Sequence, residues 1–192
     1  MLIRPMMFRG AADAGPTITT WSPTDRSGGL VLADANRTAS ASSSPAAARG
    51  TSSRTASGDY FFEVTIGGTN QGRIVVGIAA STKSLTSVPS ISPDTSAVYF
   101  DRSSGVSFNG SVLSSTSFAS GAVIGIRYLP GNPLVQFYIN GNFVVNASLS
   151  GDLSSAGSGF PFIGFDAGSA NTGKINCGQE TFAFPKGIPA WG

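Results

Sequence analysis

The sequence predicts an all-β protein, built as a two-sheet antiparallel β-sandwich with an extended arm at its N-terminus. From Thr17 onward, short apolar or alternating runs are bounded by Gly, Pro, Asn, Asp and Ser, which is the pattern of strands at regular spacing. No segment repeats its apolar residues with the period of a helix. The 25 glycines and 11 prolines interrupt the 192-residue chain too often for long helices.

The expected strands follow one another along the chain after the arm. They cover residues 18–21, 29–33, 37–41, 46–54, 60–66, 73–80, 97–101, 106–108, 122–128, 134–139, 143–147, 160–165, 174–176 and 182–184. Asn140-Gly141 predicts a tight hairpin, because both central positions of such a turn need positive φ. Asn109-Gly110 is a weaker signal of the same kind, since the run that follows it is short.

Residues 17–192 are expected to form one domain, and a chain of this length can bury a sizeable core. Large aromatic side chains dominate the energetics of such a core. The aromatic residues expected inside it are Phe61, Tyr99, Phe137, Phe162 and Phe165. Two Ser-rich loops, 81–93 and 148–159, connect expected strands, and long loops of this kind are where sandwich domains carry binding sites.

The arm, residues 1–16, shows no strand alternation. One interpretation is a frayed terminus, which is common at chain ends. The other is a docking arm, because disordered tails seldom hold so many large apolar residues. The hypothesis taken forward is docking to another protein or to a copy of the same chain, with contacts made by Leu2, Ile3, Arg4, Met6, Met7, Phe8 and Arg9.

Composition excludes several classes of function. Charged residues make up only 11% of the chain, and the formal net charge is +2 with the basic residues scattered singly. Nucleic-acid binding needs a concentrated basic surface, so no nucleic-acid partner is expected. The longest apolar runs are too short to span a bilayer, so no membrane insertion is expected. The start of the chain has no continuous apolar stretch of a signal peptide.

The sequence offers little for nucleophilic catalysis. The chain has no histidine, which removes the commonest general base and metal ligand. Serine–lysine pairs would have to use Lys83, Lys174 or Lys186, none of which lies in a known motif. The single cysteine, Cys177, is expected to be a buried strand residue rather than a nucleophile.

Carboxylate and metal chemistry are also weakly supported. A glycosidase needs two carboxylates on one cleft, and the only glutamates are Glu63 and Glu180. Asp166 and Asn171 could offer oxygen ligands to Ca²⁺, but their segment lacks the dense carboxylates of a calcium loop. We therefore expect no catalytic residue, no metal site and no cofactor.

Several stretches, taken in order, resemble the SPRY domain, a concanavalin-like β-sandwich of the jelly-roll type. Residues 58–66 (Gly-Asp-Tyr-Phe-Phe-Glu-Val-Thr-Ile) are similar to the family's Gly-x-x-Tyr-(Trp/Phe)-Glu-Val strand. Residues 73–79 (Arg-Ile-Val-Val-Gly-Ile-Ala) resemble its Val-Gly-(Ile/Val)-Ala strand. Residues 135–142 (Val-Gln-Phe-Tyr-Ile-Asn-Gly-Asn) resemble Ile-x-Phe-x-x-Asn-Gly. The likeness extends over residues 17–191.

Two departures accompany the resemblance. Ala122 stands where the family has an acidic residue after a glycine, and Cys177 replaces a family aromatic near the end of the chain. The low charge, the missing histidine and the compact single domain look like the versions of this domain found in virion proteins of tailed bacteriophages. That resemblance implies a non-enzymatic structural or binding protein on the virion.

The leading hypothesis is thus a surface decoration, fibre or tail-appendage subunit, made in the host cytoplasm. Its partners would be other virion proteins or copies of itself, as a homo-oligomer in the particle, and a glycan or protein of the host surface. The alternatives are a lectin-like carbohydrate-binding module and a SPRY adaptor that binds a short peptide. The lectin alternative is weakened because neither Ser-rich loop contains Trp or Tyr.

Overall fold

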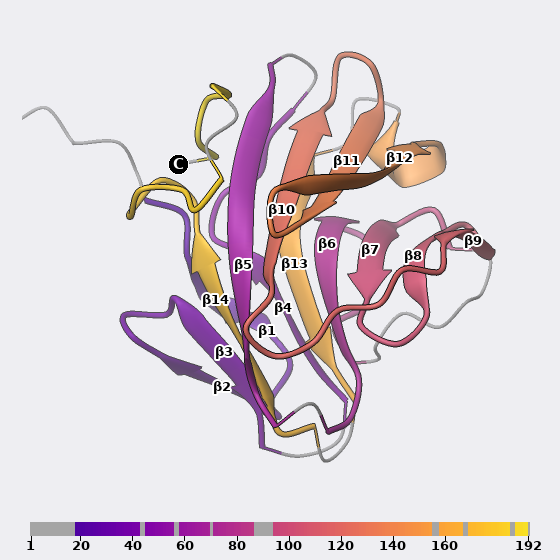
Figure 1. The fold of residues 1–192 in the computed structure, drawn as a ribbon. Coiled ribbons are helices and arrows are strands. Elements are labelled where there is room, and N and C mark those ends of the chain that lie inside the picture. The colour runs from indigo at the N-terminus through magenta and orange to yellow at the C-terminus, as the bar shows by residue number, and fades with distance from the viewer. Residues whose placement is uncertain are drawn as a thin grey trace, which may run out of the picture.

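The computed structural model describes residues 18–42, 45–55, 58–69, 71–86, 94–154, 158–166, 169–184 and 187–191. Within them, fourteen strands form two seven-stranded antiparallel sheets that pack face to face (Figure 1). The predicted all-β sandwich is confirmed. The arm residues Leu2, Ile3, Arg4, Met6, Met7, Phe8 and Arg9 lie outside the described residues, so the arm and its docking role stay predictions.

Each sheet combines strands that are far apart in the sequence. Sheet A has the order β1 (Trp21–Arg26), β4 (Ala46–Gly50), β13 (Gly159–Phe165), β6 (Ile74–Ala80), β7 (Ala97–Asp101), β8 (Gly105–Phe108) and β9 (Ser111–Ser114). Sheet B has the order β12 (Asn142–Ser148), β11 (Leu134–Ile139), β10 (Val123–Leu129), β5 (Tyr60–Gly68), β14 (Asn171–Asn176), β3 (Thr38–Ala41) and β2 (Leu30–Ala33). A single 3₁₀ turn, η1 (Gly151–Leu153), completes the described elements.

Both predicted hairpins form. Asn140 and Gly141 have φ angles of 48° and 80° between β11 and β12, and Asn109 and Gly110 have φ angles of 47° and 76° between β8 and β9. Positive φ at both central positions is the geometry that matches the twist of paired strands. The Asn-Gly signals therefore predicted two of the chain reversals from local sequence alone.

Several elements differ from the prediction. The first strand begins at Trp21, not residue 18, and runs through Pro23, which an edge strand tolerates because it need not donate to a ladder. Strand β4 ends at Gly50, and Arg54 makes only an isolated bridge to Gly159. Residues 182–184 form no strand. Conversely, β9 is a strand that the sequence prediction omitted, because most of it is exposed and shows no apolar alternation.

The five expected core aromatics are all buried, but they lie in three places. Phe137 and Phe165 belong to the large core between the sheets. Tyr99 and Phe162 belong to a second cluster with Ala47, Val75, Ala79 and Ala97. Residues of that cluster alternate along their strands with residues of the main core, so the second cluster lies on the outer face of sheet A. Phe61 is buried on the outer face of sheet B. The prediction that all five are buried is therefore confirmed, and the structure distributes them over three regions.

Among the described residues, no helix is long and apolar enough to cross a membrane.

Candidate functional site

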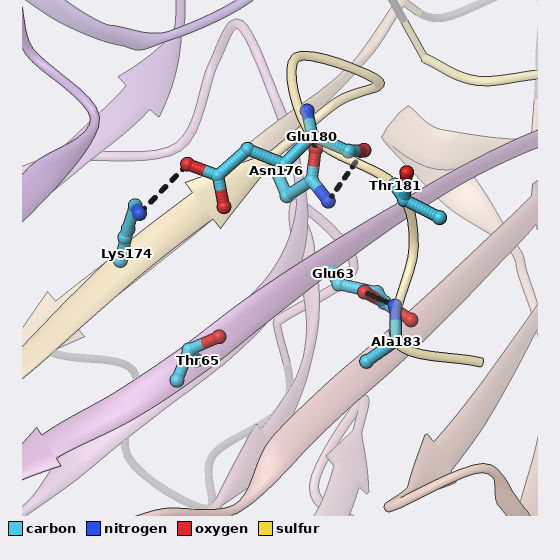
Figure 2. Close-up of a pocket in the computed structure, with 7 residues that line it drawn as sticks. All are labelled: Glu63, Thr65, Lys174, Asn176, Glu180, Thr181 and Ala183. Atoms are coloured by element: carbon cyan, nitrogen blue, oxygen red, sulfur yellow. Dashed lines mark hydrogen bonds and ion pairs between the residues drawn. The ribbon is translucent and has the colours of Figure 1, made fainter.

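The outer face of sheet B carries a hollow of about 200 Å³. Alternate residues of a strand point to one face, and the register places Thr65 opposite Lys174 and Glu63 opposite Asn176. These four side chains form the floor, and the segment after β14 supplies one wall through Glu180, Thr181 and Ala183 (Figure 2). The hollow therefore arises from two neighbouring strands and the chain that crosses them.

Residues 180–184, called the strap here, cross sheet B and are held by a buried carboxylate. Glu63 is 3% exposed, and its two oxygens accept the backbone N–H groups of Ala183 at 2.9 Å and Phe184 at 3.0 Å. The ring of Phe182 packs edge-on against Phe61, with the centroids 5.0 Å apart. The strap is thus fixed by the two oxygens of one carboxyl group and by one aromatic contact.

A glycine makes room for this arrangement. Gly125 of β10 lies opposite Glu63 in the ladder with β5. A Cβ atom at Gly125 would come within 3.0 Å of the Phe61 ring. The missing side chain lets Phe61 lie across the sheet beneath the strap.

The turn that leads into the strap is held by the side chain of Asn176. Its Oδ1 accepts the N–H groups of Gly178 at 3.0 Å and Glu180 at 3.1 Å, and its Nδ2 donates to the Glu180 carbonyl at 3.1 Å. Asparagine favours turns because its side chain bonds the backbone two to four residues on. Asn176 therefore fixes where the wall of the hollow begins.

Two cations hold the exposed rim of the hollow. Lys174 Nζ donates to Glu180 Oε1 at 2.8 Å, and Arg37 Nη1 donates to the same oxygen at 2.5 Å. The hydrogen bonds from Lys174 and then from Arg37 lower the pKa of Glu180. The rim thus carries a carboxylate that stays ionised and an ammonium group in contact with it.

Several groups of the hollow have hydrogen-bonding capacity to spare. In the described part of the chain, no hydrogen bond engages the hydroxyls of Thr65 and Thr181. An ammonium group has three donors, and the structure shows one of those of Lys174 in use. The hollow can therefore bind a small polar group that both donates and accepts hydrogen bonds.

The similarities to known proteins are similarities of the fold. No family model matches the sequence, and no curated protein matches it. The structure matches the SPRY domain of human HERC1 with a TM-score of 0.69 at 18% identity, over 83% of this chain and 99% of that domain. The fold is that of a SPRY domain. A second human SPRY domain matches with a TM-score of 0.58 at 21% identity, over 81% of this chain and 98% of that one. The PSpry domain of TRIM65 matches with a TM-score of 0.62 at 11% identity, over 83% and 92% of the two chains.

The two glutamates considered for catalysis do meet in this SPRY sandwich. Both Glu63 and Glu180 line the hollow, which the sequence alone did not predict. A glycosidase needs one carboxyl with a raised pKa as its proton donor. The pKa of Glu180 is shifted in the opposite direction, and Glu63 has both oxygens engaged in holding the strap. In the structure, the carboxyl group of Glu63 thus holds the strap and that of Glu180 is engaged with Lys174 and Arg37.

Two other candidates for nucleophilic chemistry, Cys177 and Lys83, do not line the hollow. Cys177 is buried as predicted, but it follows the last residue of β14 and does not lie in a strand. Its burial raises the pKa of the thiol. Lys83 pairs with Asp94 at 2.5 Å, in the loop beside sheet A. Lys186 lies outside the described residues.

The segment that contains Asp166 and Asn171, the possible Ca²⁺ ligands, joins neighbouring loops by hydrogen bonds. Asn171 is fully buried, and its Nδ2 donates to the carbonyls of Gln71 at 2.7 Å and Gly72 at 3.1 Å. Asp166 accepts a backbone hydrogen bond from Ser169. Within the described residues, no group of three His, Cys, Asp or Glu could hold a metal ion.

Sequence analysis missed Thr65, Asn176 and Thr181, and it weighed Lys174 only as a catalytic base. One signal for them was available. In β5, polar Glu63 and Thr65 alternate with the apolar residues Phe62, Val64 and Ile66, which marks one polar face of a strand. The pattern predicts an outward face, but it cannot predict which distant segment covers that face.

Proposed function

We propose that this domain is a non-enzymatic binding module on the virion of a tailed bacteriophage and that it makes protein–protein contacts there. The observation that carries the binding role is the hollow on sheet B. It offers an ammonium donor, an ionised acceptor and two unengaged hydroxyls on a rigid sheet. Sites of this kind hold a polar side chain of a partner by a few directed hydrogen bonds.

The likeness to SPRY domains is a likeness of fold, and it supports a binding role without indicating the ligand or the binding residues. The hollow adds a location, because its floor comes from two adjacent strands that cannot shift without breaking their ladder. The strap, held by Glu63, forms a wall whose backbone is fixed before any partner arrives. Preformed geometry of this kind lowers the entropic cost of binding.

The virion assignment is supported by composition. The low charge, the absence of histidine and the apolar residues of segment 1–16 fit a subunit that is covered by neighbours in a particle. Mass spectrometry of purified particles tests this directly. We expect the chain at many copies per particle, and its absence from particles would contradict the assignment.

A reconstitution experiment tests the hollow. Purified domain is added to particles assembled without it, and the bound amount is measured against concentration. The double variant Lys174→Ala/Thr181→Val removes donors from the hollow and should weaken binding at least about tenfold, which corresponds to about 1.4 kcal/mol. Thr172→Val is the matched control, because Thr172 lies on the same face of β14 but outside the hollow. Equal binding by the wild type, the double variant and Thr172→Val would show that the particle is contacted by another part of the domain.

One observation favours a glycan of the host surface as a second candidate ligand. Neither Ser-rich loop contains Trp or Tyr, but sheet B presents Tyr138 and Phe143, with their rings packed 5.8 Å apart and Phe143 55% exposed. Partly exposed aromatic rings beside planar polar groups suit sugar rings, which have both apolar faces and hydroxyls. Binding on a glycan array that is lost in Phe143→Ala would support this candidate, and an array without signal would remove it.

The absence of catalysis is tested separately. Hydrolase screens on glycans, esters and peptides should show no turnover above background. Turnover that disappears in Glu63→Gln or Glu180→Gln would overturn the non-enzymatic assignment.

A further inference from the structure

About a quarter of the chain, in one continuous segment, is almost without charge. Residues 103–151 contain a single charged side chain, Arg127, although the whole chain has 22 (12 basic plus 10 acidic). At the share typical of globular proteins, about a quarter, a segment of this length would hold about a dozen charges. The segment includes β8 to β12, and all of it lies among the described residues. Arg127 itself is paired with Asp59.

Two strands of the uncharged segment, β9 and β12, lie at one side of the molecule. Strand β9 is the last strand of sheet A, β12 is the last strand of sheet B, and the two strands lie against each other (Figure 1). Large apolar side chains are exposed there, with Val112 46% and Leu113 37% exposed on β9 and Phe143 55% exposed on β12. We call this side the β9–β12 edge.

The opposite side of the sandwich differs in charge. The edge strand β1 carries Asp25 and Arg26, and Asp34 and Arg37 follow closely on the edge strand β2. One apolar side chain, Val31, is 48% exposed on β2. Val31 therefore has charged residues close to it in the sequence, whereas Val112, Leu113 and Phe143 do not.

Open sheet edges normally carry protection against pairing with other chains. Natural proteins place charges or prolines on them, because unpaired N–H and C=O groups otherwise recruit another strand. Neither β9 nor β12 contains a charge or a proline. Within the described residues, β9 ladders only with β8, and β12 only with β11. An edge of this composition is expected to be covered in the working state of the protein.

We propose that the β9–β12 edge is a homotypic interface, occupied by the same edge of a second copy of this chain around a twofold axis. The sequence of β9, Ser111-Val-Leu-Ser114, reads almost the same in both directions. Two antiparallel copies of it place Ser opposite Ser and Val opposite Leu. Strand β12 has a similar symmetry in Asn142-Phe-Val-Val-Asn146. A twofold contact needs such a self-complementary surface.

Charge argues for a second copy over a different occupant. A twofold axis brings identical groups together, so a charged edge would repel itself, and this edge carries no charge that could do so. A partner with charged side chains would instead bury them without a countercharge, which is costly. The inference extends the proposed function, since a particle holds many copies, but it concerns a surface distinct from the hollow.

The solution mass of the full chain tests the proposal. In sedimentation equilibrium or light scattering, the wild type should change from monomer to dimer as its concentration rises. Leu113→Lys places two like charges near the axis and should raise the dissociation constant at least about tenfold. Val31→Lys is the matched control, because it adds the same charge at a similarly exposed apolar residue of the other edge and should leave the constant unchanged.

A second measurement covers the case in which Leu113→Lys does not fold. Leu113→Cys should form an intermolecular disulfide under mild oxidation, whereas Val31→Cys should not. The natural cysteine does not compete, since Cys177 is buried. A wild type that stays monomeric up to millimolar concentration overturns the proposal. The proposal is also overturned if deletion of residues 2–15 dissociates the dimer and Leu113→Lys does not. That result would assign self-association to the arm. Particle binding that is unchanged in Lys174→Ala/Thr181→Val, with the dimer intact, would contradict only the proposed function.

Discussion

At the scale of single residues, Glu63 shows how one side chain can decide the form of a surface. It is a buried acid on a strand, which sequence rules associate with catalysis or with a paired charge. Here its partners are two backbone N–H groups of a segment 120 residues later in the chain. The carboxylate therefore acts as an anchor that turns the C-terminal segment into a wall of the hollow.

Removing this anchor should loosen the strap. Glu63→Ala leaves the N–H groups of Ala183 and Phe184 without their acceptor, and we expect a loss of about 1–2 kcal/mol in the free energy of unfolding. Urea denaturation measures the loss. Thr65→Val is the control, since Thr65 is the next outward residue of β5, and its change should stay within about 0.5 kcal/mol. Equal losses in both variants would mean that Glu63 does not hold the strap.

The buried aromatic rings should carry a large part of the stability. Phe137→Ala and Phe162→Ala should each lower the free energy of unfolding by about 3–5 kcal/mol, because each ring is completely buried. Phe143→Ala, at an exposed ring, should cost less than about 1 kcal/mol in the same urea experiment. A small loss in Phe162→Ala alone would show that the cluster outside sheet A contributes little.

Asp101 should make stability sensitive to acid. Burial by itself raises the pKa of Asp101, but hydrogen bonds from the Ser103 backbone and from Arg73 lower the pKa by more, so that it lies below its ordinary value of 3.8. The unfolded chain then takes up the proton first as the pH falls. The stabilisation is complete above about pH 5 and is lost as the pH falls through the folded-state pKa.

Asp101→Asn should therefore be less stable than the wild type at neutral pH and lose less stability between about pH 5 and pH 2. Thermal melting across this range measures both effects. Parallel curves for the two proteins would show that other groups, such as Asp94, whose pKa is also lowered, account for the acid sensitivity.

At the scale of elements, the close approach of strands depends on particular glycines. Gly77 lies in β6 between β13 and β7, near the middle of sheet A. A Cβ atom at Gly77 would come within 2.1 Å of the Val98 carbonyl oxygen and 2.7 Å of the Tyr99 Cα, both in the backbone of β7. Backbone atoms in a ladder cannot give way as a side chain can, so the glycine is required where it stands.

Gly77→Ala should cost about 2–3 kcal/mol in the free energy of unfolding or prevent folding. Gly164→Ala provides the comparison, because Gly164 is in the neighbouring strand β13 and the one close approach of its added Cβ would be to the Val75 Cγ2 methyl at 3.1 Å. A methyl group can shift, so this second change should cost less than about 1 kcal/mol. Guanidinium denaturation of both variants measures the two losses in the free energy of unfolding. Equal costs would show that the ladder adapts to the added atom.

At the scale of the whole molecule, we expect the two ends of the chain to have different roles. Trp191 is completely buried, stacks on Tyr128 with the ring centroids 5.7 Å apart, and donates from Nε1 to the Ser52 carbonyl at 3.1 Å. Its backbone N–H also donates to the Phe61 carbonyl at 2.9 Å. The C-terminal residues therefore complete the core, whereas the predicted arm precedes the first strand.

Opposite effects are expected from changes at the two ends. Trp191→Ala should lower the free energy of unfolding by about 3–5 kcal/mol, because it empties a large site in the core. Deletion of residues 2–15 should leave the melting temperature nearly unchanged and should abolish assembly onto particles. Normal assembly would make the arm a frayed terminus. Unfolding on deletion would place the arm in the core and the domain boundary before residue 17.

Local sequence by itself determined the fold class, most strands and both Asn-Gly hairpins. Those features depend on φ preferences and on alternation along a few neighbouring residues, which Asn140, Gly141 and the β5 pattern display directly. It also placed Glu63 on a polar face without assigning its partner.

Only the tertiary structure decided where the distant segments meet. It placed the strap over β5, brought Glu63 and Glu180 to one hollow, and divided the expected aromatic core into three regions. It also revealed β9 and β12 as adjoining edges. These outcomes depend on strand order and on which face of each sheet is covered. No local pattern encodes them, because a strand with the same alternation can pair with many neighbours until packing of the whole chain selects one.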